Sequence, residues 1–431
     1  MSGAPELPFV RFGPEATPAS VASALRTAGR TPREVQTTVA DLIAQVEEGG
    51  DAALLELVGR FDLGGKTVGD VRVPADRLDP TLLDPEVRSG LETAIMNVAI
   101  VADAGVGEDT VAQLPQGHSV TLREIPVRSA AIYAPGGQAA YPSTIVMGVV
   151  TARAAGVERI CVLTPPPVSD VVLATCALCG VDEVYAMGGA HGVAALALGT
   201  ETIERVDVIA GPGSVWAQEA KRQLADRVGI DGYYGPSDLA ILAGADASAE
   251  LVALDLMAQG EHNGLSTVLL ASPSSELLDA VQARVGELAT ESDWPRPSAI
   301  GLALTDDELG ALAVVEAYAP EHLQLIGQHA EHLARDVRSA GCLLVGPFSA
   351  TAFGDYVAGS NHSLPTAGSA RFASGLSTRV FRRRMSEVRI TADAASALAW
   401  AGAPIARAEG FPWHARSMEA RMRQDGGSHG S

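Results

Sequence analysis

The sequence SAAIYAPGGQAAYPSTIVMGVVTARAAGVERICVLT, residues 129–164, contains a short apolar run, a glycine turn, a helical segment and a second apolar run. Apolar and helical segments continue to alternate through residue 228, with further apolar runs in EVYAM and VDVIA. Short β-rich runs separated by helices are typical of a parallel sheet that helices cover. We therefore predict a βαβαβαβ unit in this region.

A second alternation begins at Asp238, where LAILAG, STVLLAS, SAIGLAL and CLLVG are separated by helical segments. No linker-like stretch separates the two alternations. The predicted fold is therefore α/β, with two closely packed, Rossmann-like parallel-sheet lobes. Residues 1–127 and 238–367 are expected to form the first lobe, with a helical N-terminal part, and residues 128–237 the second, inserted lobe.

The two ends of the chain carry less of this pattern. Residues 17–60 are predicted to form helices, the first of which ends at Gly29. In residues 368–431 the sheet pattern fades, so we predict a C-terminal tail with an alanine-rich helix near 394–408. Beyond Arg423 the sequence QDGGSHGS is expected to be disordered.

Composition and charge argue against several classes of protein. The 431 residues carry a formal net charge of −21, and a chain this acidic repels phosphate backbones. Its densest basic run, RVFRRR at 379–384, is short enough to be a solvated face or a subunit contact. No stretch of about 18 apolar residues runs free of charged or helix-breaking residues, and the N-terminus has no basic start followed by an apolar segment. We expect a cytoplasmic protein that binds neither nucleic acid nor membranes.

The four cysteines are too few and too scattered to form a disulfide framework. Cys176 and Cys179 form a CxxC motif within the apolar run VVLATCALCG. Because no second CxxC and no histidine lie nearby, buried packing is favoured over zinc binding or redox chemistry.

Three glycine-rich turns follow predicted strands, at Gly136–Gly137, Gly188–Gly189 and Gly211–Gly213. Ligands of open parallel sheets bind beyond the carboxyl ends of the strands, where such turns lie. Glycine lets backbone amides approach a phosphate, although tight strand-to-helix packing also selects glycine. The G-x-G-x-x-G pattern with a later acidic residue and the P-loop pattern are both absent. The turns alone therefore leave the ligand open.

Three pairs of side chains contain atoms that can bind a metal. Gln259 and His262 are spaced at i and i+3, which would place them on one face of a helix. The segments GDYVAGSNHSLP and EGFPWHA each add a carboxylate and a histidine: Asp355 with His362, and Glu409 with His414. A single pair is more often an ordinary surface or core pair, so a metal site requires that the pairs converge.

The segment APEHL, residues 319–323, places Glu321 next to His322. Pro320 is typical of a helix start, so we predict that both residues lie in a first helical turn, where the helix dipole keeps a carboxylate ionised. Their side chains would point about 100° apart and could act as two different bases. An acidic first turn beside a solvated histidine is the alternative.

Taken together and in order, these segments resemble histidinol dehydrogenase from about Val35 to His414. The shared motifs are YAPGG followed by PST, GGAHGVAALALGTE, VDVIAGPGS with EAKRQ, IDGYYGPSD, DLMAQGEH, APEHL, GDYVAGSNHSLPT, ARFASGLS and the spacing of Glu409 and His414. One such motif could arise by chance, whereas the whole series in the order of the family is specific.

The resemblance implies an enzyme that oxidises L-histidinol through L-histidinal to L-histidine, the last steps of histidine biosynthesis, and reduces two NAD molecules in turn. The implied ligands of one Zn²⁺ per subunit, which mainly holds the substrate, are Gln259, His262, Asp355 and His414. Within the implied catalytic pair, His322 removes the hydroxyl proton and Glu321 activates water on the aldehyde.

The resemblance also implies contacts to cofactor, substrate and partner. Tyr133, His191 and Ser214 occupy positions that bind NAD. The implied substrate contacts are Ser237, Gln259, His262, His322, Asp355, Glu409 and His414, and His362 matches a position near the site. The family is a homodimer in which the C-terminal tail, with Glu409 and His414, completes the partner's site.

Four positions depart from the family pattern. His191 replaces a glutamine and Ser214 an asparagine on the cofactor side, but both can still donate hydrogen bonds, so we expect altered NAD affinity rather than loss of NAD use. Asp238 and Thr351 each replace a glutamate on the substrate side. With these two changes on the substrate side, the alternative is that the chain is a member of the same family that oxidises another primary alcohol, such as a sulfonated diol.

Two other classes of protein would explain part of this residue set. A zinc hydrolase with Glu321 as general base would explain the metal ligands but not the three glycine turns. A binding protein without catalytic activity would have no use for two bases beside four metal ligands.

Overall fold

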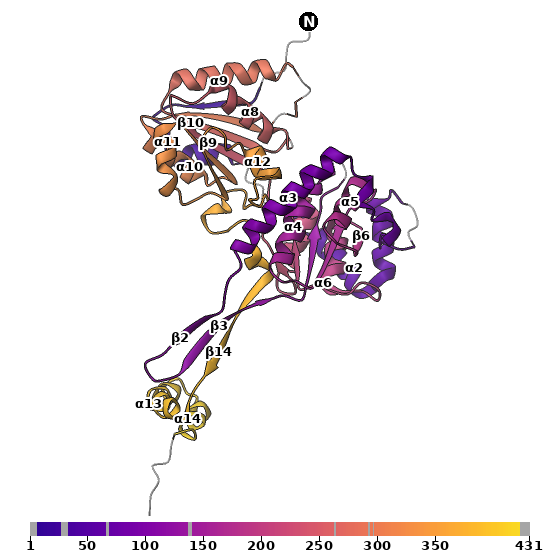
Figure 1. Cartoon of the computed structure of the whole chain (residues 1–431), viewed down its shortest axis with the longest axis vertical. Coiled ribbons are helices and arrows are strands. Elements are labelled where there is room, and N and C mark those ends of the chain that lie inside the picture. Colours follow the sequence, from indigo (N-terminus) through magenta and orange to yellow (C-terminus); the bar gives the residue numbers. More distant parts are fainter. Residues whose placement is uncertain are drawn as a thin grey trace, which may run out of the picture. The chain divides into compact units, whose positions relative to one another are not determined.

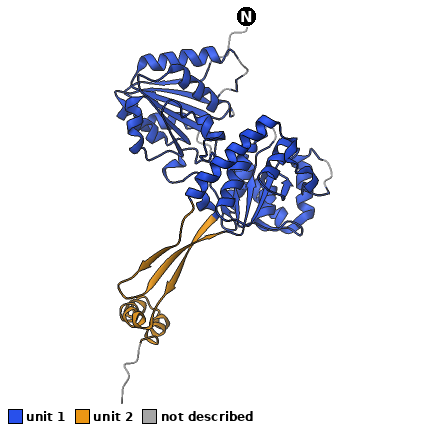
Figure 2. Cartoon of the chain, viewed as in Figure 1, with its two compact units in different colours: residues 1–105, 127–381 blue, residues 106–126, 382–431 orange. Residues whose placement is uncertain are grey.

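The computed structural model describes residues 7–26, 33–65, 69–136, 140–262, 264–291, 294–295 and 297–422. The chain forms two compact units, unit 1 of Met1–Gly105 with Val127–Phe381 and unit 2 of Val106–Pro126 with Arg382–Ser431 (Figure 2). Two expectations from the sequence lie outside the described residues: the role of Gly137 in the first glycine turn, and disorder after Arg423. The first helix ends at Leu25 and not at Gly29 as predicted, because Arg26 already has extended backbone angles.

Residues 129–230 of unit 1 contain a five-stranded parallel sheet with strand order β6-β5-β4-β7-β8. Its strands are β4 Ser129–Tyr133, β5 Arg159–Thr164, β6 Val184–Ala186, β7 Val208–Ala210 and β8 Gly229–Ile230. Every residue of β4 is buried. A parallel strand with helices on both faces has no solvated side, so its sequence is apolar throughout.

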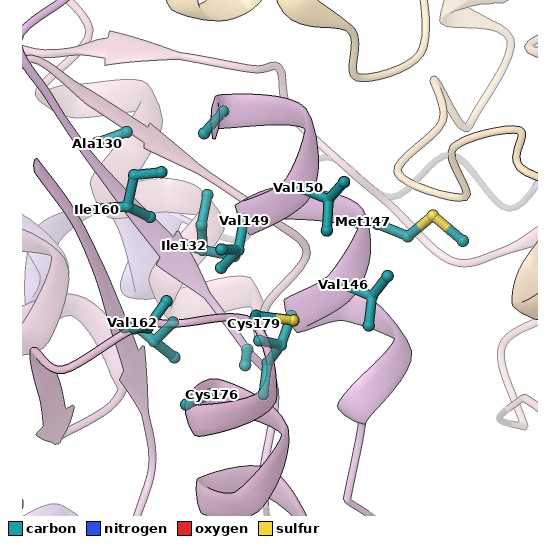
Figure 3. Close-up of a cluster of buried hydrophobic side chains, with 14 of the residues drawn as sticks. Ala130, Ile132, Val146, Met147, Val149, Val150, Ile160, Val162, Cys176 and Cys179 are labelled. Carbon is teal, nitrogen blue, oxygen red and sulfur yellow. The ribbon is translucent and has the colours of Figure 1, made fainter. Parts of the chain in front are cut away.

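Helices cover both faces of this sheet, because alternate residues of a strand point to opposite sides. Ala130 and Ile132 pack with α3 Pro85–Ala104, α4 Pro142–Ala154 and α5 Asp170–Leu178, the helices so labelled in Figure 1. Figure 3 shows Ile132 beside Val149 of α4. Ala131 and Tyr133 pack with α2 Arg33–Leu57, α6 Gly189–Leu198 and α7 Val215–Gln223.

The CxxC motif lies in the first of these cores. The side chains of Cys176 and Cys179 point toward α4 and the sheet among aliphatic neighbours (Figure 3), and both cysteines are free. Burial raises the pKa of the Cys179 thiol to about 12. The predicted packing role is therefore confirmed, because a thiol that stays protonated is a poor nucleophile and a poor ligand.

A six-stranded parallel sheet of order β1-β11-β10-β9-β12-β13 forms the other half of unit 1. Its strands are β1 Phe9–Phe12, β9 Asp238–Ala243, β10 Thr267–Ser272, β11 Ala299–Leu304, β12 His322–Ile326 and β13 Cys342–Val345. One face packs with α8 Ala249–Gly260 and α9 Ser275–Leu288. The other packs with α1 Pro18–Leu25, α10 Glu308–Tyr318 and α11 Gln328–His332. The predicted α/β fold with two parallel-sheet lobes is confirmed.

The lobe boundaries taken from the sequence stay a prediction, and the packing of two helices differs from it. The sequence pattern predicts that residues 1–127 belong with the six-stranded sheet, whereas α2 and α3 pack against the five-stranded sheet. Burial of apolar side chains such as Val39 and Leu91 decides which sheet a helix covers, and chain order does not.

Shorter helical segments connect these elements. A π-helix, Val58–Asp62, continues α2, and α12, Thr351–Tyr356, follows β13 and contacts α8. Across the described ranges, no helix combines the length and the apolar character that a bilayer crossing requires.

Unit 2 contains an antiparallel sheet that the sequence analysis missed. Its strands are β2 Thr110–Gln113, β3 Ser119–Pro126 and β14 Arg382–Arg389, in the order β14-β3-β2. The interpretation of residues 368–431 as a tail without strands is therefore wrong for β14. Its side chains stay largely exposed and pair by charge, as when Arg384 Nε donates to Glu124 at 2.7 Å, so no apolar alternation marks it.

Two helices complete unit 2. They are α13 Ala392–Ala408, which matches the predicted alanine-rich helix, and α14 Pro412–Glu419. They pack on each other through small residues such as Ala403, Ala406 and Ala415.

Truncating a core side chain should destabilise unit 1. Ile132 is fully buried in the five-stranded sheet, so Ile132→Ala should lower the free energy of unfolding by about 2–5 kcal/mol. Ile100→Ala is the matched control because Ile100 is 61% exposed on α3, and its cost should stay within about 0.5 kcal/mol. Urea unfolding of both variants measures the difference, and equal costs would contradict the packing described above.

Candidate active site

Two cavities adjoin the carboxyl ends of the five-stranded sheet. The first pocket has a volume of about 320 Å³ and the second about 390 Å³, and Pro135, just after β4, lines both. The six-stranded sheet contributes to the first pocket with the amino ends of its strands, since Ser237 precedes β9 and Glu321 precedes β12. The first pocket therefore lies at the carboxyl ends of strands in one sheet and at the amino ends of strands in the other.

The first pocket brings together several of the side chains selected from the sequence as candidates. Five of them line it: Ser237, His262, Glu321, His322 and Asp355. They come from four separate segments of the chain, and each is positioned by the start of a strand or the end of a helix. His362 lines the same pocket.

The segment APEHL does not begin a helix, so that prediction is wrong. Ala319 adopts a left-handed conformation with φ 47° and ends α10, and His322 is the first residue of β12. The apolar run that follows is buried in a parallel sheet, which overrides the helix-start signal of Pro320. The helix dipole therefore does not hold Glu321 ionised.

Glu321 is a buried carboxylate with a small set of donors. It is 6% exposed, and it accepts hydrogen bonds from the hydroxyl of Ser237 at 2.5 Å and from the backbone N–H of Asp238 at 3.0 Å. Burial raises the pKa of Glu321, and the charge of His322 and these two hydrogen bonds oppose it only in part. A carboxylate with a raised pKa is a stronger base once it is ionised.

Asp238 supports Glu321 in a way that sequence reasoning did not find. The backbone N–H of Glu321 donates to Asp238 Oδ1 at 2.7 Å, and that of Ala367 donates to Oδ2 at 3.2 Å. Burial, followed by the charge of Glu321, raises the pKa of Asp238 to about 7. Residues 238 and 321 thus each hold the other's side chain through a backbone amide.

His322 is the second candidate base. Its Nε2 lies 3.4 Å from Oδ1 of Asp355, and its Nδ1 lies 4.0 Å from Oε2 of Glu321. Burial lowers the pKa of His322, but the hydrogen bond to Asp355 and the charges of Glu321 and Asp355 outweigh it, so the pKa is raised. No described residue forms a hydrogen bond with Nδ1. That nitrogen is buried, and its hydrogen-bonding capacity is unused among the described residues.

Gln259, His262 and Asp355 provide metal-binding atoms beside these bases. Gln259 is buried at the end of α8, and its Oε1 has no partner among the described residues. His262 follows α8 instead of sharing its face, and its Nε2 lies 4.0 Å from Oδ2 of Asp355, which itself lies on α12 rather than in a loop.

These atoms suit a metal that accepts oxygen and nitrogen. Within the described ranges, no three or more His, Cys, Asp or Glu side chains are grouped closely enough to hold a metal. An amide such as that of Gln259 does not belong to these types. Its unpaired oxygen, with an imidazole and a carboxylate nearby, fits the donor set that zinc tolerates, although three protein ligands from one chain leave a tetrahedral shell incomplete.

His362 links the loop after α12 to α4. Its Nδ1 lies 2.8 Å from the carbonyl oxygen of Asp355, and its Nε2 lies 3.3 Å from Oγ1 of Thr144. Burial lowers the pKa of His362 and favours the neutral ring. Thr144 was missed as a site residue, although it belongs to the PST segment that the sequence analysis quoted.

The second pocket brings together Tyr133, His191 and Ser214. The hydroxyl of Tyr133 accepts the N–H of Gly189 at 3.1 Å, and Nε2 of His191 lies 2.9 Å from Oδ2 of Asp62. Asp62, which also accepts the N–H of Gly188 at 2.9 Å, comes from the π-helix and was not predicted. Nothing in its local sequence marks it, because its partners lie more than a hundred residues away.

Glu409 and His414 belong to unit 2. Glu409 follows α13 and His414 lies on α14, where its ring meets Phe411 at 5.4 Å between centroids. Both side chains are exposed. The structure describes unit 2 by itself, so the role of these two residues in a site stays a prediction.

Comparisons with known proteins agree on one family. A sequence model of the family described as histidinol dehydrogenase matches residues 25–422. The histidinol dehydrogenase of Corynebacterium jeikeium (strain K411) is 38% identical, with 96% of this chain and 97% of the relative covered. That of Mycobacterium tuberculosis (strain ATCC 25618 / H37Rv) is 39% identical, with 96% and 97% covered. The crystal structure of histidinol dehydrogenase from Elizabethkingia anophelis superposes with a TM-score of 0.89 at 28% identity, covering 96% of this chain and 98% of that one.

Replacing Asp238 should change how stability depends on pH. The pKa of Asp238 is raised from 3.8 to about 7, so the folded protein takes up a proton there as the pH falls through about 7, while the unfolded chain does not. Lowering the pH toward about 5.5 should therefore stabilise the wild type relative to Asp238→Asn.

Thermal midpoints at about pH 8 and about pH 5.5 test this, with an expected relative gain for the wild type of about 2 °C or more. Asp76→Asn, at an exposed aspartate, serves as the control and should leave the pH dependence unchanged. Parallel pH profiles for the wild type and Asp238→Asn would contradict the buried pair.

Proposed function

The chain belongs to the histidinol dehydrogenase family, and on this premise we propose that it is a cytoplasmic enzyme that oxidises L-histidinol through L-histidinal to L-histidine with two molecules of NAD. The observation that carries the proposal is the pairing of two buried bases, Glu321 and His322, in one pocket that adjoins a second, glycine-bordered pocket. Two dehydrogenations with a hydration between them require such a pair of bases.

His322 serves the two oxidation steps in this proposal. Its unpaired Nδ1 accepts the hydroxyl proton of the alcohol, and Asp355, 3.4 Å from Nε2, stabilises the imidazolium that forms. The same base then acts on the hydrated aldehyde, which has the same need to lose a hydroxyl proton. Burial of the ring keeps water from competing for that proton.

Glu321 serves the hydration step. Its raised pKa makes the carboxylate a competent base for a water molecule beside the aldehyde. The hydroxyl of Ser237 and the N–H of Asp238 hold the side chain in one orientation. Ser237 also accepts a hydrogen bond from Gln259 Nε2, so the water-activating base and a metal-binding residue share one hydroxyl.

Gln259, His262 and Asp355 would hold a zinc ion, with His414 as the fourth protein ligand. When bound, zinc supplies an anchor for the substrate and polarises it. The support for this site is the unpaired buried oxygen of Gln259 beside an imidazole and a carboxylate. One Zn²⁺ per subunit is expected.

NAD would bind in the second pocket. When bound, it accepts the hydride from the carbon that bears the hydroxyl group. Tyr133, His191 and Ser214 line this pocket, and Gly188 has no room for a side chain, because a Cβ atom there would lie 2.6 Å from Pro165. The pairing of His191 with Asp62 leaves the ring fixed as part of the wall, so it supports altered NAD affinity rather than loss of NAD use.

Unit 2 would complete the active site of a second subunit. It exposes large apolar side chains, with Trp400 and Trp413 each 74% exposed and Ile405 59% exposed. Exposed aromatic side chains of this kind mark protein interfaces. We place Glu409 and His414 in the partner's pocket, where Glu409 contacts substrate, so that neither site works without the other chain.

The alternative substrate, another primary alcohol, rests on Asp238 and Thr351. Both are buried, and neither lines a described pocket. The two replacements therefore act on packing around Glu321 and α12 rather than on the surface that meets the substrate, which favours L-histidinol.

NADH formation from limiting L-histidinol tests the proposed reaction. The purified, zinc-loaded protein should form about two NADH per substrate molecule, because both oxidations occur at one site. Chelation of the metal should abolish the signal, and added zinc should restore it. A ratio near one would show that the second oxidation does not occur, and no NADH at all would contradict the proposal and direct attention to other alcohols.

Mixing two inactive variants tests the shared site. His414→Asn alters the tail and Glu321→Gln alters the body of the subunit, so a mixed dimer should contain one intact site. After exchange of subunits, activity should recover to roughly a quarter of the wild-type value.

The matched control mixes His414→Asn with Glu409→Gln. Both changes lie on the tail, so every site in this mixed dimer receives a defective tail and activity should stay low. Recovery in neither mixture, with subunit exchange verified by differently tagged chains, would place the tail residues in their own subunit or outside the site.

A further inference from the structure

We propose that the buried ion pair of Lys221 and Asp231 is a positioning element that aligns the second pocket with the first for hydride transfer. The proposal rests on the proposed function, because it assumes that cofactor and substrate occupy these two pockets. It assigns no catalytic step to either residue. Both act through the turn Gly211–Ser214 and through Tyr234.

The pair is fully enclosed. The side chains of Lys221, on α7, and Asp231, after β8, are 1% and 0% exposed, and the ammonium group contacts the carboxylate directly. Taking two charges out of water is costly, and an apolar pair of similar volume is often as stable or more stable. Stability alone is therefore a weak explanation for a buried charge pair at this place.

The pair binds the two successive peptide groups on either side of Gly211. Asp231 accepts the N–H of Gly211 at 2.6 Å, and Lys221 Nζ donates to the carbonyl oxygen of Gly211 at 3.0 Å. Gly211 has φ +117°, and a Cβ atom there would lie 2.3 Å from the carbonyl oxygen of Tyr133. The turn therefore packs directly against β4 on one side, and the charged groups of Lys221 and Asp231 bind it on the other side.

This turn separates the two pockets. Pro212 and Gly213 line the first pocket, whereas Ser214 lines the second. A carbon that gives up a hydride must lie within about 3–3.5 Å of the atom that accepts it. A displacement of the turn would therefore change the approach of substrate and cofactor without removing a group that touches either reacting atom.

Lys221 also supports the wall of the first pocket. Its ammonium group lies 5.0 Å from the ring centroid of Tyr234, which lines that pocket. Gln218, on the same helix, accepts the N–H of Tyr234 at 3.1 Å and donates to the carbonyl oxygen of Gly211 at 3.4 Å. One buried cluster therefore contacts elements that line both pockets.

The double variant Lys221→Met/Asp231→Asn tests this inference. It leaves no unpaired buried charge, so the protein should fold, and the introduced amide keeps an acceptor oxygen for the N–H of Gly211. We expect kcat to fall about 10- to 100-fold and the isotope effect with L-histidinol deuterated at the carbinol carbon to rise, because hydride transfer becomes slower. A purely structural role would lower the thermal midpoint without changing the isotope effect.

The matched control is Arg159→Met/Glu183→Gln. This ion pair lies at the start of β5 and just before β6, in the same lobe, and its side chains are 23% and 13% exposed. Neither residue lines either pocket. The control should keep kcat and the isotope effect of the wild type. An equal loss of kcat in both double variants, or wild-type kinetics in Lys221→Met/Asp231→Asn, would overturn the inference.

A second variant and a second measurement cover the cases in which the double variant does not fold or the wild type is inactive. If Lys221→Met/Asp231→Asn does not fold, Lys221→Arg keeps both charges of the pair while changing the donor to the carbonyl oxygen of Gly211, and it should show a smaller change in the same direction. If the wild type forms no NADH with L-histidinol, the proposed function fails, and NADH binding measured by energy transfer from tryptophan replaces kcat. The double variant should then bind NADH more weakly than the control variant, and equal binding would overturn the inference.

Discussion

Two carboxylates buried side by side, Glu321 and Asp238, impose the constraint on which the site depends. Each needs hydrogen-bond donors to offset the cost of burial, and each receives the other's backbone N–H, across 83 residues of sequence. This exchange requires β9 and β12 to be neighbouring parallel strands with His322 opposite Leu239. The pairing of two strands therefore sets the position of Glu321, the proposed water-activating base. Ser237 donates to Glu321 and accepts a hydrogen bond from Gln259, so their positions depend on the same pairing.

The two parallel sheets contribute opposite ends of their strands. The five-stranded sheet presents its carboxyl ends, whose glycine turns can meet a phosphate-bearing cofactor. The six-stranded sheet presents the amino ends of β9 and β12, which carry the bases, while α8 and α12 supply the metal-binding atoms. The candidate acid–base residues and the glycine turns come from different sheets. A substitution in one of these two sets of residues therefore need not alter the backbone that carries the other set. The buried charges behind Gly211 lie at the place where the two groups meet.

Much of the fold was predictable from local pattern. Runs such as SAAIY and VDVIA are apolar because both faces of a parallel strand are covered, and helices with glycine turns separate them. The packing of Cys176 and Cys179 followed from their apolar surroundings. The antiparallel sheet of unit 2 was not predictable, because β14 pairs with β3 through exposed, charged side chains more than 250 residues away. The helix expected at Glu321 failed because burial in β12 outweighed a local helix signal.

The α/β class, the family resemblance and the candidate residues for binding, proton transfer and metal ligation could all be inferred from the amino-acid order alone. These properties depend on residue type and spacing, which are local. Three contacts become visible only in the folded chain: Glu321 and Asp238 each accept the other's backbone N–H, His191 pairs with Asp62, and Lys221 and Asp231 both bind Gly211 between the two pockets. Each of these depends on the pairing of distant strands and helices, and burial then changes the pKa values of groups such as Glu321, Asp238 and His322. No local pattern carries that information, because desolvation is a property of the packed chain.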